Sequence, residues 1–370
     1  MKRFLIVLLC LVIVPFSAYA DEEYDSYIES FDLSAFSELP DEATHLLEDL
    51  GIADFDYESI SDISLGSIFE HIYNVIVNRA NGPLKSGIMI ICFVILSSFF
   101  KAFSNELYRN DSSFYSTITT LIIAIFLVTR LTDCISICCS TIELCANFAF
   151  AFFPVFCVIV ATGGGALTSI SVNTMLLSLA QGLNAISQIV FIPASNSFLA
   201  VSICSSLRNE LNLNGVVTFF KKIITMSISV LSAMFVSVLT LKTAVASRTD
   251  ALGLRSIRFA INTVVPVIGN SISEGLLSIQ SYSGLIKTSV GVVGIIAVAL
   301  IFLPALIEVV LWRGALFVAG LCAGVFDDEA SSKVINCFTD MLLIINVILI
   351  LSMVTTIISI GILIAAKTGV

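Results

Sequence analysis

Long apolar segments follow one another from residue 84 to residue 366 and limit what this chain can fold into. They lie at about 84–103, 114–132, 140–162, 171–190, 194–207, 223–246, 289–311 and 340–366. A helix of about 20 apolar residues matches the hydrocarbon core of a bilayer. With 57% hydrophobic and 12% charged residues, the chain carries more apolar surface than a soluble fold of this length can bury. The sequence therefore predicts an all-α, polytopic transmembrane helical bundle.

The first 20 residues have the pattern of a signal peptide. Lys2 and Arg3 form a basic start, residues 4–14 are apolar, and residues 18–20 offer a cleavage site made of small residues around Tyr19. The apolar stretch has eleven residues, whereas a membrane-spanning helix needs about 20. We therefore expect cleavage and export of the residues that follow, with an uncleaved anchor as the alternative.

Residues 21–82 form the acidic part of the chain. Between residues 21 and 80 there are sixteen Asp and Glu residues and a single base, Arg79. Helical periodicity in two short stretches predicts an acidic, extracytoplasmic helical head. A break at residues 81–83 should separate this head from the polytopic membrane domain at 83–370. Because such an acidic surface repels nucleic acid, the expected partners are the lipid bilayer and other proteins, with no nucleic acid.

The segment at 247–288 is amphipathic, unlike the apolar segments that flank it. Apolar side chains recur at helical spacing between residues 254 and 265, while Arg255, Arg258 and Asn262 share the adjoining face. We expect a helix that lies at the membrane interface or lines a polar vestibule. There, Arg255 and Arg258 are predicted to contact an anionic group of a partner, a lipid or cargo.

Ionisable residues within the apolar segments are further candidates for function, because each is costly in lipid unless it is paired. Glu143 and Glu308 are the deepest acids, and Arg313 follows Glu308 at a spacing of five. Spacing along a helix allows two ion pairs, Arg130 with Asp133 at a spacing of three and, less favourably, Glu308 with Arg313 at a spacing of five. Each of these residues either makes a structural polar contact or lines a pathway.

Several glycines are predicted to matter for packing rather than for ligand binding. The Gly163-Gly164-Gly165 run follows an apolar segment, where a tight turn is favoured over an anion cradle because no phosphate-loop lysine accompanies it. Gly291 and Gly294 are expected at close approaches between helices. Gly269 is expected to help end the amphipathic helix.

The chain has no sequence motif typical of an enzyme. The motifs HExxH, GxSxG and CxxC are absent from the apolar part, and both histidines, His45 and His71, lie in the acidic head. The cysteines that follow residue 20 lie in or beside apolar segments, where thiols usually act as small packing residues. We therefore expect no catalysis, no cofactor and no metal.

The sequence resembles the family of stage III sporulation protein AE of endospore-forming bacteria. The similarity covers nearly the whole chain and is most specific at Lys242-Thr243-Ala244-Val245-Ala246, Thr249-Asp250, Leu254-Arg255, Val265-Pro266-Val267-Ile268-Gly269 and Lys287-Thr288-Ser289-Val290-Gly291-Val292-Val293-Gly294. The Thr162 to Ala166 turn and Phe302-Leu303-Pro304-Ala305-Leu306 also fit. The acidic head is similar in plan only.

The resemblance implies a non-catalytic membrane component of a secretion-like channel complex between mother cell and forespore. It implies a place in the mother-cell membrane around the forespore, with the head on the extracytoplasmic side. It also implies partners that include a separate ATPase subunit and a forespore-encoded protein. The alternative is a self-contained secondary transporter with helices broken at Pro154, Pro193 and Pro304, but the two halves of the chain show no internal repeat.

Overall fold

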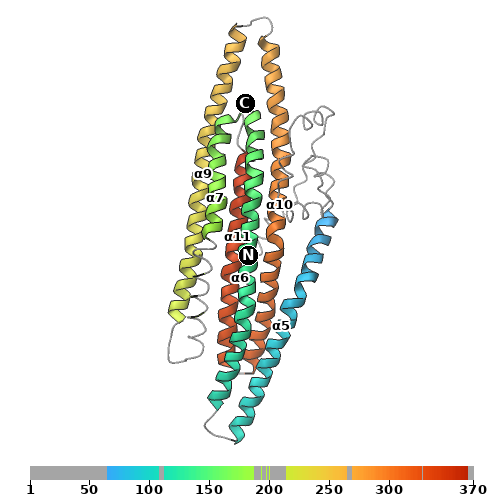
Figure 1. Ribbon diagram of the computed structural model, residues 1–370, viewed down its shortest axis with the longest axis vertical. Helices are drawn as coiled ribbons and strands as arrows, with labels where there is room; N and C mark the ends of the chain where they lie inside the picture. Colours follow the sequence, from blue (N-terminus) through green and yellow to red (C-terminus); the bar gives the residue numbers. More distant parts are fainter. Residues whose placement is uncertain are drawn as a thin grey trace.

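The structure is a computed structural model that describes residues 65–107, 112–186, 214–264, 269–326 and 328–365, together with positions 193, 197 and 200. The predicted signal peptide and most of the predicted acidic head lie outside the described residues. Within the described ranges the chain is a bundle of long α helices without a strand (Figure 1). The helices are α5 (Leu65–Leu107), α6 (Ser112–Thr162), α7 (Ala166–Ile186), α9 (Asn214–Val264), α10 (Gly269–Val325) and α11 (Glu329–Ala365). The all-α prediction is confirmed.

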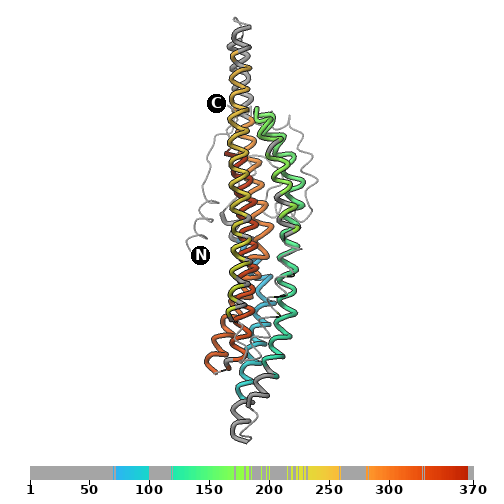
Figure 2. The backbone as a smooth tube through the Cα atoms, turned by 90° about the vertical axis from the view of Figure 1, so that its left-hand side faces the viewer, coloured from blue at the N-terminus to red at the C-terminus, as the bar shows by residue number. Residues whose placement is uncertain are grey.

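The helices share one long axis and pack in two layers. Figure 2 shows α6 and α7 beside a second layer that holds α9, α10 and α11. The α5 helix packs mainly on the lower half of α10, and α9 and α10 extend past the turn between α6 and α7 (Figure 1). The α6 and α11 helices run in the same direction and in constant register, because Thr120 meets Ser331 and Cys145 meets Thr356.

The core of the bundle is formed by α6, α10 and α11 and is rich in aromatic side chains. Phe148, Phe152 and Phe156 of α6 are fully buried, and their rings stack with centroid distances of 5.2 and 5.3 Å. They recur every four residues, so they form one continuous ridge on α6. The opposite wall is α10, where glycines let the helix approach this ridge closely.

Several predicted breaks between apolar segments are wrong, because the helices continue through them. The α5 helix runs through residues 81–83 with Pro83 buried inside it, and α6 joins the predicted segments 114–132 and 140–162. Pro154 and Pro304 also lie inside helices. A proline removes one helix hydrogen bond, but packed neighbours can hold the helix on both sides of it.

Five of the described helices are long and apolar enough to cross a membrane. The apolar parts are Ile72–Phe99, Thr120–Thr162, Thr225–Ile257, Ser283–Val325 and Ala330–Ala365. One of these parts, Thr120–Thr162, joins the segments 114–132 and 140–162, which were expected to be separate. The chain therefore has the character of a multi-pass membrane protein, and its described helices are longer than the predicted segments.

Candidate functional site

The best-defined polar site joins α9 to the start of α7, and sequence analysis did not predict it. The Asp250 carboxylate of α9 accepts hydrogen bonds from the backbone N–H groups of Leu167 at 3.0 Å and Thr168 at 2.9 Å, and from the Thr168 hydroxyl at 2.8 Å. Asp250 is buried. The first N–H groups of a helix lack partners within the helix and favour a negative charge. Asp250 therefore caps α7 from another helix.

The glycine run at 163–165 forms the turn between α6 and α7. The backbone N–H groups of Gly163, Gly164 and Gly165 donate to carbonyls of the last turn of α6 at 3.0 to 3.3 Å. Gly164 has φ 89°, a conformation that favours glycine. These N–H groups are engaged inside the chain, so the run forms a turn and not an anion cradle.

The same turn is fixed against α10 by a small contact. The Ser283 hydroxyl donates to the Ile159 carbonyl at 3.1 Å, and a Cβ at Gly163 would lie 2.6 Å from the Ser283 oxygen. With Asp250 on the other side, the α6–α7 turn is held by α9 and α10 together. This upper end of the bundle is therefore a junction of four helices.

Gly291 and Gly294 lie where α10 approaches the aromatic ridge of α6. A Cβ at Gly294 would lie 2.3 Å from the Phe152 ring, and one at Gly291 would lie 2.5 Å from Ile364 and 3.1 Å from Phe156. Real Cβ atoms do not come this close, so both positions need glycine or a shift of their neighbours. Gly269 is the first residue of α10, after the connection at 265–268, which is outside the described residues.

Glu308 makes a different ion pair from the predicted one. Its carboxylate accepts a hydrogen bond from Arg79 of α5 at 2.6 Å and is 15% exposed, while the buried Nε of Arg313 has no hydrogen-bond partner. The Glu308–Arg313 prediction is wrong because five helical residues place two side chains roughly 140° apart around the axis. The other predicted pair, Arg130 with Asp133, is present at 3.8 Å.

The remaining candidates do not converge on one place. Glu143 is exposed on α6, and Arg255 is exposed on α9. The side chains of Arg258 and Asn262 lie outside the described residues. The predicted amphipathic helix is not separate, because α9 continues to Val264, and Ile257 on its predicted apolar face is 53% exposed.

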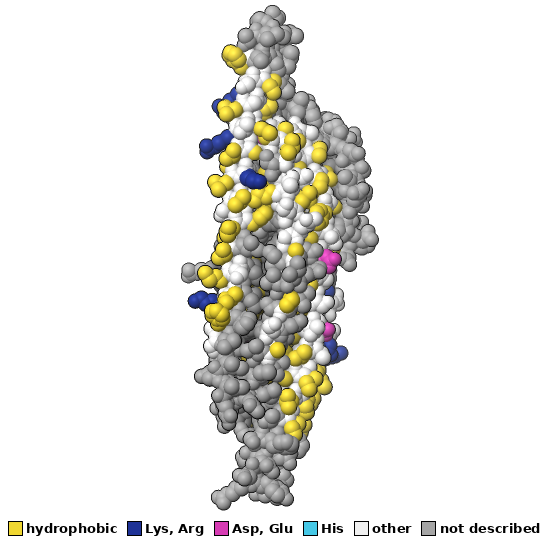
Figure 3. Space-filling view, turned by 60° about the vertical axis from the view of Figure 1, so that its left-hand side comes forward, with side chains coloured by type: hydrophobic (Ala, Val, Ile, Leu, Met, Phe, Trp, Pro, Cys, Tyr) yellow, Lys and Arg dark blue, Asp and Glu magenta, His cyan; other side chains and the backbone are white. Residues whose placement is uncertain are grey.

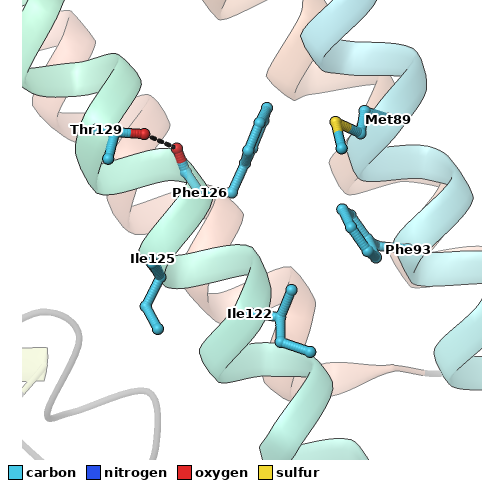
Figure 4. Close-up of a pocket in the computed structure, with 6 residues that line it drawn as sticks. All are labelled: Met89, Phe93, Ile122, Ile125, Phe126 and Thr129. Atoms are coloured by element: carbon cyan, nitrogen blue, oxygen red, sulfur yellow. Dashed lines mark hydrogen bonds between the residues drawn. The ribbon is translucent and has the colours of Figure 1, made fainter.

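An apolar groove of about 370 Å³ lies between α5 and α6 in the lower half of the bundle (Figure 4). It is lined by Met89, Phe93, Ile122, Ile125, Phe126 and Thr129. The Thr129 hydroxyl donates to the Phe126 carbonyl at 2.8 Å, so its hydrogen is not available to a ligand. The groove suits an apolar group and holds no charged side chain for chemistry. Among the described residues, no group of three His, Cys, Asp or Glu side chains could hold a metal ion.

These features define an all-α, multi-pass helical bundle in which a buried carboxylate caps α7 and glycines allow close contacts between helices. The family model for Stage III sporulation protein AE matches residues 55–367. This chain therefore belongs to the Stage III sporulation protein AE family, a family of sporulation proteins. It is similar to the Stage III sporulation protein AE of Bacillus subtilis (strain 168), with 22% identity over 275 residues that cover 74% of this chain and 67% of the relative. No solved structure matches it.

Proposed function

We propose that this chain is a non-catalytic membrane subunit of a secretion-like channel complex that links mother cell and forespore during endospore formation. The observation that carries the proposal is the family match over residues 55–367, which spans every described helix. The bundle adds physical support, because long apolar helices with exposed apolar faces suit a platform or conduit wall in a membrane assembly.

The proposal extends to location and partners. The protein acts in the mother-cell membrane that surrounds the forespore, with its acidic head on the extracytoplasmic side. Its partners are the other membrane proteins of the complex, a separate ATPase subunit and a forespore-encoded protein. Arg255, Arg258 and Asn262 near the upper end of α9 are proposed partner contacts, because a cationic helix end beyond the bundle suits an anionic group.

The test is deletion of the gene in its own host, followed by forespore volume and late forespore gene expression under the microscope. Engulfed forespores that shrink and fall silent, with rescue by the intact gene, support the proposal. Normal forespores combined with a defect in vegetative uptake or efflux would reject it. That second result would favour a self-contained secondary transporter.

A further inference from the structure

The outer face of α9 shows which part of the bundle lies in lipid. Between Lys222 and Lys242 there are nineteen residues without a charge, a length of about 28 Å that matches the hydrocarbon core. Large apolar side chains are exposed along this stretch, at Ile223, Met226, Val230, Met234, Val238 and Leu241. Figure 3 shows hydrophobic side chains along α9 with basic side chains among them. The lysines at the two ends can reach the lipid headgroups.

Three of the four exposed hydroxyl groups between Lys222 and Lys242 are bonded within the helix, and Ser227 is the exception. Ser229, Ser237 and Thr240 each donate to the backbone carbonyl four residues earlier, at 2.7 to 2.8 Å. A helix face with apolar side chains and internally bonded hydroxyls is compatible with lipid.

The apolar span of α9 extends from Thr225 to Ile257, but above Lys242 it carries the charges of Arg248, Asp250 and Arg255. We therefore place the membrane along the uncharged stretch between Lys222 and Lys242.

The Asp250 cap shows which residues of α9 and α6 lie at the same level along the bundle axis. Asp250 binds the first turn of α7, which directly follows the upper end of α6. The α6 and α9 helices run in the same direction (Figure 1). Counting down both helices at equal rise places Lys242 level with roughly residue 154 of α6 and Lys222 level with roughly residue 134. With the membrane placed in this way, residues 136–153 of α6 lie within it.

At this depth α6 exposes a polar stripe. Its members are Ser136, Ser140, Glu143 and Asn147, which are all exposed and share one helix face. The Ser140 hydroxyl bonds to the Ile137 carbonyl, but Glu143 and Asn147 have no hydrogen bond or ion pair within the part of the chain that the structure describes. A carboxylate facing lipid near the membrane centre costs about 3 kcal/mol or more. At similar depth, α9 exposes Val230 and Met234 instead.

We infer that this stripe of α6 faces a water-filled path through the membrane. The inference deepens the proposed function, on which its interpretation as a conduit wall rests. The stripe from Ser136 to Asn147 is about 16 Å long, more than twice the depth of one headgroup layer, so a position at the membrane surface does not account for it. The path favours cations, because no base among the described residues pairs with Glu143.

Cysteine labelling tests the inference with two positions at matched depth. Asn147→Cys lies on the stripe, and Met234→Cys lies on the lipid face of α9. Membranes from the sporulating host are treated with a water-soluble cationic thiol reagent, and labelling is followed at each site by mass spectrometry. We expect Asn147→Cys to react about tenfold faster or more, because the thiolate forms only in contact with water. Ser140→Cys, on the same face, guards against a folding defect at one position.

The carboxylate supplies a second readout. At Asn147→Cys, a cationic thiol reagent should label faster than an anionic one, because the Glu143 charge one helical turn away attracts the first and repels the second. Adding Glu143→Gln should lower the ratio of the cationic to the anionic labelling rate about tenfold at low salt. An unchanged ratio overturns the assignment of Glu143 to the path.

Two results overturn the path itself. Equally slow labelling at Asn147→Cys and Met234→Cys means that the stripe faces lipid or a dry protein interface. Equally fast labelling means that the α9 face does not mark the membrane. The deletion phenotype is a separate measurement: silent forespores without labelling at Asn147 keep the sporulation role and reject the path. Labelling with normal forespores keeps the path and rejects the role.

Discussion

Removal of the Asp250 side chain of α9 should destabilise the start of a second helix, α7. It accepts three hydrogen bonds from the first turn of α7 and is buried. Asp250→Ala leaves two backbone N–H groups of α7 without a partner away from water. We expect the protein in detergent to lose about 2 kcal/mol of stability. The measurement is thermal unfolding of the purified protein.

The matched control for Asp250 is its neighbour. Thr249 is exposed, and its hydroxyl bonds to the Val245 carbonyl of its own helix, so Thr249→Ala should change stability by less than about 0.5 kcal/mol. Asp250→Asn should lie between the two, because it keeps an acceptor oxygen but loses the charge. Equal melting temperatures for Asp250→Ala and Thr249→Ala would contradict the capping role.

Gly294 allows a comparison within one helix. A methyl group there meets the fully buried Phe152 ring, so Gly294→Ala should destabilise the protein by about 1–3 kcal/mol through overpacking. Gly314, also in α10, has no atom near the place of a Cβ, so Gly314→Ala should be neutral or stabilise by up to about 1 kcal/mol. The same unfolding assay compares them, and equal effects would argue against a close approach of α10 to α6.

At the scale of elements, the α5–α10 contact includes an ion pair between Arg79 and Glu308, which are far apart in sequence. Arg79 is 44% exposed and Glu308 is 15% exposed, so either single reversal, Arg79→Glu or Glu308→Arg, places like charges together beside the bundle. We expect each reversal to lower the abundance of folded protein, and the double reversal to restore much of it, with a coupling of about 1 kcal/mol.

Quantitative blotting of membranes from cells that carry each variant measures this coupling. Arg130→Glu, on the exposed face of α6, should not be rescued by Glu308→Arg and serves as the control. Additive effects of the Arg79 and Glu308 reversals would mean that the two side chains act independently.

The sequence predicts the elements better than their connections. Apolar periodicity correctly indicates helices. The turn at Gly163–Gly165 can also be predicted, because three consecutive glycines have no Cβ atoms to restrict the backbone. The contacts of Asp250 and Glu308 cannot be read from spacing, because their partners lie 82 and 229 residues away. The predicted breaks at residues 81–83 and 133–139 are wrong for one reason. Polar or proline residues between apolar segments need not end a helix that is packed on its neighbours.

For the whole molecule, the apolar length exceeds what one membrane can cover. The apolar parts of α6 and α10 have 43 residues each, about 64 Å, or twice the hydrocarbon core. We infer from the Lys222–Lys242 stretch of α9 that the upper half lies in lipid. The lower end of α9 lies well above the lower end of α6 (Figure 1). The lower half, with the α5–α6 groove, still exposes Ile88 at 62% and Ile125 at 66%. Protein rather than lipid should cover it.

One lysine in each half tests this division. Met234→Lys, in the lipid-facing stretch of α9, should lower the amount of membrane-inserted protein, because a lysine near the membrane centre costs about 3 kcal/mol. Ile125→Lys, at the groove, should leave insertion unchanged but reduce the size of the complex recovered in mild detergent, because a charge disrupts an apolar protein contact. Blotting and size-exclusion chromatography give the two readouts. A loss of insertion for Ile125→Lys equal to that for Met234→Lys would place the lower half in lipid, and the membrane would then have to cover a bundle twice its own thickness.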